Sequence, residues 1–217
     1  QSKGDNHNIP STGSKEINKR EDQNQNSNQS SIFDYTQHDI ILGNHNAKVR
    51  VLEYSAPTCV HCAYYKSNIF PHIKEKYINT NQIAYVIREF VGNKQDQAAS
   101  ILAHCAGKTR FLKFESIIYT RQDSWAYSNN YKDILTNIGK IGGIPEEQYN
   151  KCLNDKSLSD GLYKLTMEVI NYPNFIGTPT FFIGDKMHNK PYSLTELSKA
   201  IDIELEKVKN DKDIKNQ

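Results

Sequence analysis

Two short apolar runs in the first half of the chain have the pattern of buried strands. Residues 49–54 read VRVLEY and residues 82–90 read QIAYVIREF, and both runs are rich in β-branched and aromatic side chains. Between the two runs, apolar side chains recur at the spacing of one helix face: Tyr65, Ile69, Ile73 and Tyr77. The pattern predicts a strand, a helix kinked near Pro71, and a second strand.

From Gln95 to about Tyr172 the hydrophobic spacing becomes helical throughout. Successive apolar stripes begin at Ala98, Phe111 and Tyr131, and the third stripe is closed by two glycines. The run TPTFFIG at residues 178–184 then returns to a strand pattern, and a turn after it predicts a short edge strand. The SLTE sequence that begins at Ser193 is a capping box, which predicts a last helix running through Leu205.

This order of elements resembles the thioredoxin arrangement, in which a strand–helix–strand unit is separated from a later hairpin and helix. The predicted fold class is therefore α/β, a thioredoxin-like fold with an inserted helical domain. The predicted boundaries are 32–94 and 174–208 for the thioredoxin-like domain, 95–173 for the helical domain and 209–217 for a flexible C-terminal tail.

The composition of the N-terminal segment differs from that of the rest of the chain. Residues 1–31 contain almost no large apolar side chains, so we expect a disordered tail or a tether to a membrane anchor. The chain begins at Gln1 rather than Met, which suggests that a signal or anchor has been removed. The formal net charge of +2 favours neither nucleic acid nor an anionic surface as a partner.

The first candidate site is the CxxC pair formed by Cys59 and Cys62, with His61 between them. It follows a predicted strand and opens a predicted helix, where free N–H groups and the positive end of the helix dipole stabilise a thiolate. We expect Cys59 to be the exposed, attacking sulfur and Cys62 to be the resolving one. His61 is expected to lower the pKa of Cys59 further by a hydrogen bond or by its charge.

Two other roles are possible for this pair. A zinc site needs four ligands, and the sequence offers no second CxxC or HxxxH, with His104 and Cys105 as a poor substitute. A purely structural disulfide is the other alternative. The order of strand, turn, CxxC and helix favours a redox pair over both.

Two further positions fit a redox site. Glu53 interrupts an apolar strand six residues before Cys59, and a buried carboxylate there is costly without a role or a partner. We expect Glu53 to accept a proton from Cys62 during exchange, although strand alternation could instead point it to solvent. Thr178–Pro179 precedes a β-rich run and is expected to form a cis-proline loop facing the thiols.

Together these segments resemble the DsbA-like family of bacterial thiol-disulfide oxidoreductases, over a match from about Asp39 to Lys207. The segments are VRVLEYSAPTCVHCAYY, IFPHIKEKYINTNQIAYVIREF, ASILAHCAG and IGTPTFFIGDK. The resemblance implies a catalytic set of Cys59, Cys62, His61 and Glu53, and a substrate-binding surface of Thr178, Pro179 and Val60. It implies no cofactor or metal, a monomer in the periplasm, reduced secreted proteins as substrates, and a membrane quinone reductase of DsbB type as reoxidant.

The sequence departs from the best-known pattern of that family at two positions. Val60 stands where the pattern has proline, and Thr178 stands where it has valine. Both positions tune the reactive thiolate and the release of partners, so the values of DsbA, whose reactive cysteine has a pKa of about 3.5, do not carry over directly to this chain.

The remaining cysteines, Cys105 and Cys152, each lie on the apolar stripe of a predicted helix. Two buried free thiols are one possibility, since cysteine is often a small core residue. An oxidising compartment and the resemblance, in which some members carry a similar pair, favour a structural disulfide between them.

Three rival functions remain open from the sequence. The first is a disulfide reductase or isomerase of the same compartment, which a measured redox potential would distinguish. The second is a non-catalytic peptide-binding or chaperone-like module, which would not need Cys59. The third is a kappa-type glutathione transferase, which the intact CxxC disfavours.

Overall fold

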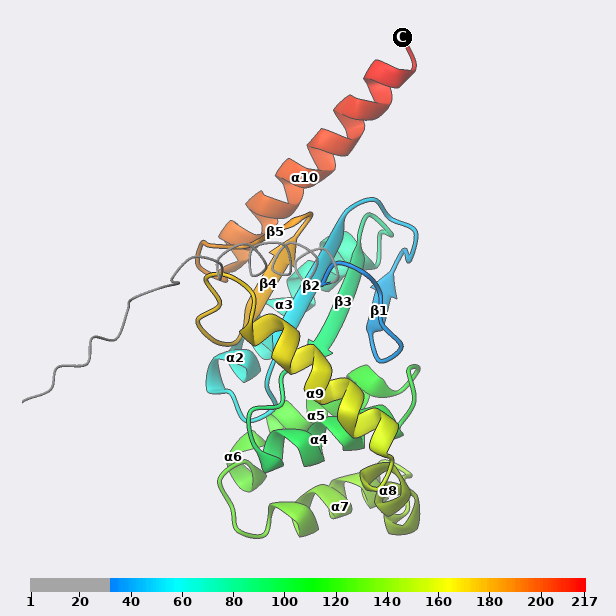
Figure 1. Cartoon of the computed structure of the whole chain (residues 1–217), viewed down its shortest axis with the longest axis vertical. Coiled ribbons are helices and arrows are strands. Elements are labelled where there is room, and N and C mark those ends of the chain that lie inside the picture. The colour runs from blue at the N-terminus through cyan, green and yellow to red at the C-terminus, as the bar shows by residue number, and fades with distance from the viewer. Residues whose placement is uncertain (1–31) are drawn as a thin grey trace, which may run out of the picture. The chain divides into compact units, whose positions relative to one another are not determined.

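The structure, a computed structural model, describes residues 32–217, so the tail predicted for residues 1–31 lies outside the described residues. Five strands form one mixed sheet with the order β1-β3-β2-β4-β5 (Figure 1). The central strands β2 and β3 run parallel, and the other neighbours are antiparallel. The strands are β1 (Ile40–Gly43), β2 (Arg50–Ser55), β3 (Ala84–Glu89), β4 (Thr180–Ile183) and β5 (Lys186–Met187).

Strand β1 was not predicted from the sequence. Its four residues are too few to show a strand pattern, and the strand is held by antiparallel pairing with β3, with Ile40 opposite Ile87. The residue before it, Asp39, makes a buried ion pair with Arg88 of β3, with 2.8 Å between Oδ1 and Nε. Both long-range contacts depend on β3, which lies some forty residues later in the chain.

The helix between β2 and β3 is broken where the sequence predicts a kink. Helix α2 (Val60–Asn68) ends before Ile69, and α3 (Phe70–Ile73) begins with Pro71 in its first turn, followed by a π-helical segment, η1 (Lys74–Ile78). Proline is tolerated in a first turn because the N–H it lacks has no helical partner there. This arrangement confirms the predicted kink.

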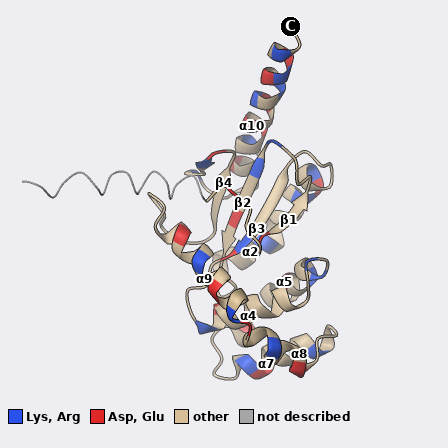
Figure 2. Ribbon diagram, turned by 45° about the vertical axis from the view of Figure 1, so that its right-hand side comes forward, with Lys and Arg blue, Asp and Glu red and all other residues tan. Residues whose placement is uncertain are grey.

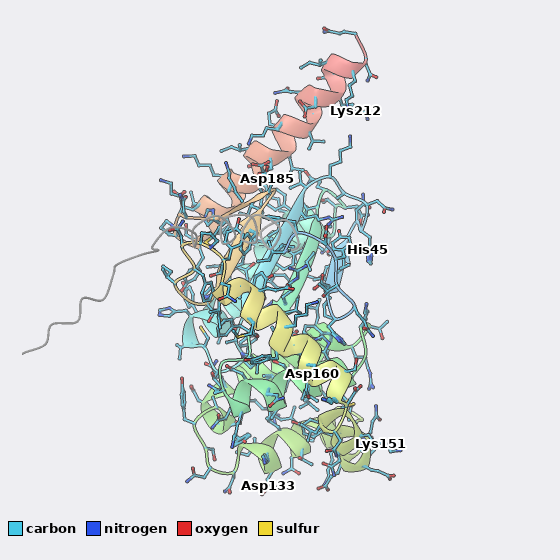
Figure 3. The ribbon with its side chains drawn as sticks, in the orientation of Figure 1. His45, Asp133, Lys151, Asp160, Asp185 and Lys212 are labelled. Atoms are coloured by element: carbon cyan, nitrogen blue, oxygen red, sulfur yellow. A yellow bond between two sulfur atoms is a disulfide. The ribbon has the colours of Figure 1, made fainter. Side chains whose placement is uncertain are left out.

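Six helices lie between β3 and β4, as predicted for the helical insertion. They are α4 (Lys94–Cys105), α5 (Phe111–Thr120), α6 (Gln122–Trp125), α7 (Tyr131–Ile141), α8 (Glu146–Leu153) and α9 (Lys156–Ile170). Buried aromatic side chains, including Phe111, Phe114, Trp125 and Tyr149, fill the core of this layer. Charged residues such as Asp133 and Lys151 point outward from α7 and α8 (Figure 3).

A disulfide joins Cys105 at the end of α4 to Cys152 in α8, with 5.8 Å between their Cα atoms. The longest helix of the insertion, α9, then runs back alongside the sheet and contacts β3 (Figure 1). The helical layer is therefore tied to the thioredoxin-like part by α9 as well as by its two connections.

The predicted flexible tail at residues 209–217 is wrong, because helix α10 (Leu194–Lys215) continues almost to the end of the chain. Basic and acidic residues are interspersed along it (Figure 2), and opposite charges three and four positions apart support a solvent-exposed helix. One such pair joins Lys207 and Glu204 at 3.0 Å. In the described part of the chain, no helix has the length and apolar character needed to cross a bilayer.

Candidate active site

The CxxC pair lies at the N-terminus of α2, directly after strand β2 and a short turn. Cys59 is the N-cap residue, with extended backbone angles, and its Sγ accepts the N–H of Cys62 at 3.2 Å. Both thiols are free, and Cys59 is partly exposed while Cys62 is fully buried. This arrangement presents one sulfur to solvent and keeps the other one turn inside the helix.

The two thiols have opposite acidities. A hydrogen bond with the Cys62 side chain, joined by the Thr178 side chain and the N–H groups of Cys62 and His61, outweighs burial and lowers the pKa of Cys59 to about 6. Burial, and then the hydrogen bond with Cys59, raise the pKa of Cys62 far above its ordinary value. At neutral pH Cys59 is therefore the thiolate nucleophile and Cys62 the thiol that donates to it.

The loop before β4 faces the reactive sulfur. Cys59 Sγ lies 3.5 Å from the carbonyl oxygen of Thr178, to which it can donate only in the protonated thiol form, and the Thr178–Pro179 peptide bond is cis. Val60, the residue after Cys59, is 60% exposed, and Ile176, two residues before Thr178, is 99% exposed.

The side chain of His61 does not bind Cys59. Its Nδ1 lies 3.1 Å from the hydroxyl of Tyr192, which lies just before α10. The backbone N–H of His61 helps to lower the pKa of Cys59. The decrease in pKa that was expected from the imidazole therefore comes from the main chain of the same residue.

Glu53 is fully buried in β2, so it does not point to solvent. Its carboxylate accepts hydrogen bonds from Tyr85 at 2.6 Å, from Ser55 at 2.6 Å and from Lys66 Nζ at 2.7 Å. Burial, together with the nearby Cys62, Glu115 and Glu53, raises the pKa of Tyr119 well above its ordinary value. Ser55 and Tyr119 are both buried in the same region as Glu53 and the resolving thiol.

A second buried carboxylate shares the same lysine. Lys66 Nζ lies 2.8 Å from Glu115 Oε1 on α5, and all three charged side chains are less than a tenth exposed. Burial outweighs the attraction of Lys66 and raises the pKa of Glu115 to about 7. The sequence alone indicates neither Lys66 nor Glu115 as a site residue, because nothing in either local pattern shows that the two helices meet.

The turn that leads into Cys59 is also held by the helical insertion. Side chains of Asn93, Asp96, Gln122 and Tyr127 all reach residues 57–59. These residues were not candidates from the sequence either, since they lie more than thirty positions away along the chain.

Comparisons with known proteins agree with this geometry. A family model described as thioredoxin matches residues 35–203. A Rickettsia felis protein named as a protein-disulfide oxidoreductase is 48% identical over 82% of this chain, and the chain spans 64% of the length of that relative.

Solved structures give the same picture of the fold. The alpha-DsbA1 of Wolbachia pipientis superposes with a TM-score of 0.75 at 29% identity, covering 82% of this chain and 96% of that one. BdbD of Bacillus subtilis superposes with a TM-score of 0.68 at 20% identity, covering 77% of this chain and 93% of that one, and shares the fold.

Proposed function

This chain belongs to the DsbA-like thiol-disulfide oxidoreductases of the thioredoxin superfamily, and on that premise we propose that it introduces disulfides into reduced secreted or periplasmic proteins. The proposed direction, in which the enzyme oxidises its substrate, is supported by the difference in pKa between Cys59 and Cys62. With a pKa of about 6, Cys59 is roughly nine-tenths ionised at pH 7. A stabilised thiolate favours the reduced enzyme, so the oxidised enzyme gives its disulfide away readily.

The size of this effect follows from the thiolate fraction. Relative to a free cysteine with a pKa of about 8.5, a pKa of about 6 stabilises the reduced form at pH 7 by a factor of about ten. For a two-electron couple, tenfold corresponds to about 30 mV toward a more oxidising potential. The structure therefore supports a moderate oxidant rather than an extreme one.

The proposed exchange begins with the oxidised Cys59–Cys62 pair. A substrate thiolate attacks the sulfur of Cys59, the bond between the two cysteines breaks, and Cys62 leaves as a thiolate that takes up a proton. The mixed disulfide holds the substrate against the Thr178–Pro179 loop. A second substrate thiolate then attacks the substrate's own sulfur, which releases the substrate disulfide and the Cys59 thiolate.

Cys62 needs a proton when it leaves, because its raised pKa makes a buried thiolate unfavourable. We propose that this proton, lost by the substrate thiol when it ionises, is relayed to Cys62 by the buried group around Glu53, whose carboxylate accepts the Ser55 hydroxyl. The same groups would accept the proton when the enzyme is reoxidised.

Reoxidation would need a partner that accepts two electrons, and a membrane quinone reductase of DsbB type is our candidate. The exposed apolar side chain of Val60, next to Cys59, suits an unfolded substrate segment, whose own apolar residues are still accessible. The proposed compartment is the periplasm, because a pair of this kind works where disulfides persist.

The experiment compares oxidation of reduced ribonuclease with reduction of insulin under the same conditions. We expect fast oxidation of ribonuclease and slow reduction of insulin, with both activities abolished in Cys59→Ser. The reverse order of rates would identify a reductase, and full activity of Cys59→Ser would identify a binding module without thiol chemistry.

A further inference from the structure

Gln122, at the start of α6, holds the backbone of the reactive cysteine. Its side chain is 5% exposed, and Nε2 donates to the carbonyl of Pro57 at 2.8 Å and to the carbonyl of Cys59 at 3.0 Å. The Cys59 carbonyl also accepts the first helical hydrogen bond of α2, from the N–H of Ala63 at 3.1 Å. Two donors from different elements therefore fix the direction of this carbonyl.

The residue between the two bound carbonyls is held by other side chains of the insertion. Thr58 donates its N–H to Asp96 at 2.8 Å, accepts from Tyr127 at its carbonyl at 3.1 Å, and accepts from Asn93 at its hydroxyl at 3.3 Å. Asp96 and Asn93 also cap α4, so changing either would disturb that helix. Both side-chain hydrogen bonds of Gln122 leave its own short helix, so a change of this side chain disturbs no helix cap.

The angle ψ of Cys59 links this contact to the chemistry. Rotation about ψ turns the Cys59 carbonyl and, at the same time, moves the first turn of α2 relative to Cys59 Sγ. The observed value of 119° places Sγ where it accepts the N–H of Cys62. A donor that holds the carbonyl therefore also keeps the sulfur aligned with the N–H groups of the helix.

We propose that Gln122 is a positioning residue for Cys59, through which the helical insertion sets the ionisation of the reactive thiol. This inference rests on the proposed redox role of Cys59. It gives the insertion a part in the reaction, in addition to its packing against the sheet.

The test is an ultraviolet titration of the Cys59 thiolate in the fully reduced protein, which needs no substrate. Gln122→Met keeps the length of the side chain and removes both donors, and we expect the pKa of Cys59 to rise by about one unit, a tenfold lower ratio of thiolate to thiol. Gln122→Glu directs a carboxylate at the two carbonyls and at the nearby thiolate, and the rise should be larger.

The matched control is Tyr149→Phe. It removes another buried hydrogen bond of the insertion, from the Tyr149 hydroxyl to the Ala98 carbonyl at 2.6 Å, without touching the turn at residues 57–59. We expect it to lower stability and to leave the pKa of Cys59 at the wild-type value.

Three outcomes would overturn the inference. The first is an unchanged pKa of Cys59 in Gln122→Met. The second is an unchanged pKa of Cys59 in Gln122→Glu, if that variant is the one that folds. The third is a shift of the Cys59 pKa in Tyr149→Phe as large as the shift in the Gln122 variants. The wild-type titration separates the two proposals. An ordinary pKa of Cys59 in the wild type would count against the proposed oxidase. A low wild-type pKa that stays the same in the Gln122 variants would count against the positioning role alone.

Discussion

The buried group formed by Glu53, Lys66 and Glu115 holds two carboxylates and one ammonium ion, so it carries a surplus negative charge when all three are ionised. Lys66 Nζ donates to both carboxylate oxygens of Glu53, at 2.7 and 3.0 Å, and lies 2.8 Å from Glu115 Oε1. Burial alone would lower the pKa of Lys66, but the charges of Glu115 and Glu53 outweigh it and raise that pKa. Glu53 and Lys66 already balance each other, which makes Glu115 the group that changes protonation near neutral pH.

The magnitude follows from the raised pKa of Glu115. Its ordinary value of 4.5 is raised to about 7 in the folded protein, and each pKa unit corresponds to about 1.4 kcal/mol. A carboxyl group with a raised folded pKa destabilises the fold above that pKa, and protonation relieves the cost as pH falls from 7 toward 4.5. Ionised Glu115 therefore costs up to about 3 kcal/mol at pH 8 and much less at pH 5.

The variant Glu115→Gln keeps the size of the side chain and removes the surplus charge. We expect it to raise the free energy of unfolding by up to about 3 kcal/mol at pH 8 and by less than about 1 kcal/mol at pH 5. Urea unfolding of the oxidised protein at both pH values measures this difference.

Glu147→Gln is the control, because the side chain of Glu147 is 86% exposed in α8. We expect a change within about 0.5 kcal/mol at either pH. A loss of stability in Glu115→Gln at pH 8, or an equal gain at both pH values, would refute the charge account of this buried group.

Two further predictions concern the loop that faces the thiols and the second disulfide. The Thr178 side chain helps to lower the pKa of Cys59, so Thr178→Val should raise that pKa and slow ribonuclease oxidation; an ultraviolet titration that matches the wild type would contradict it. The disulfide between Cys105 and Cys152 spans 47 positions, so replacing both by alanine should cost about 4 kcal/mol in the chain-entropy model, measured by urea unfolding; an unchanged midpoint would show that the bridge adds nothing.

The parts of the fold predicted from the sequence are those that have a strong local pattern. The strands around Val51 and Val86, the helix break near Pro71 and the cysteine pair at a helix start all follow from spacing and residue type within one segment. Strand β1 and the last turns of α10 were missed because the first depends on pairing with β3 and the second on weak charge pairs along an exposed helix.

The residues of the candidate site also fall into those that the sequence predicts and those that only the structure shows. Cys59, Cys62 and Glu53 stand out because a thiol pair at a helix start and a charge within an apolar strand are visible locally. Lys66, Glu115 and Gln122 do not stand out, since polar residues on a helix usually face solvent. Only the packing of α5 against α2, and of Gln122 against the turn at residues 57–59, shows that they are buried.

The most direct test of the central claim is the reduction potential of the Cys59–Cys62 pair, measured by equilibration with a glutathione redox buffer at pH 7. DsbA has a potential of about −120 mV with a reactive cysteine whose pKa is about 3.5. A Cys59 pKa of about 6 stabilises the reduced form less than the DsbA value of about 3.5 does. This difference makes the pair less oxidising than DsbA by about 70 mV at pH 7, so we expect a potential of about −190 mV. A potential at or below about −270 mV, the value of thioredoxin, would contradict the proposal that this chain is an oxidase.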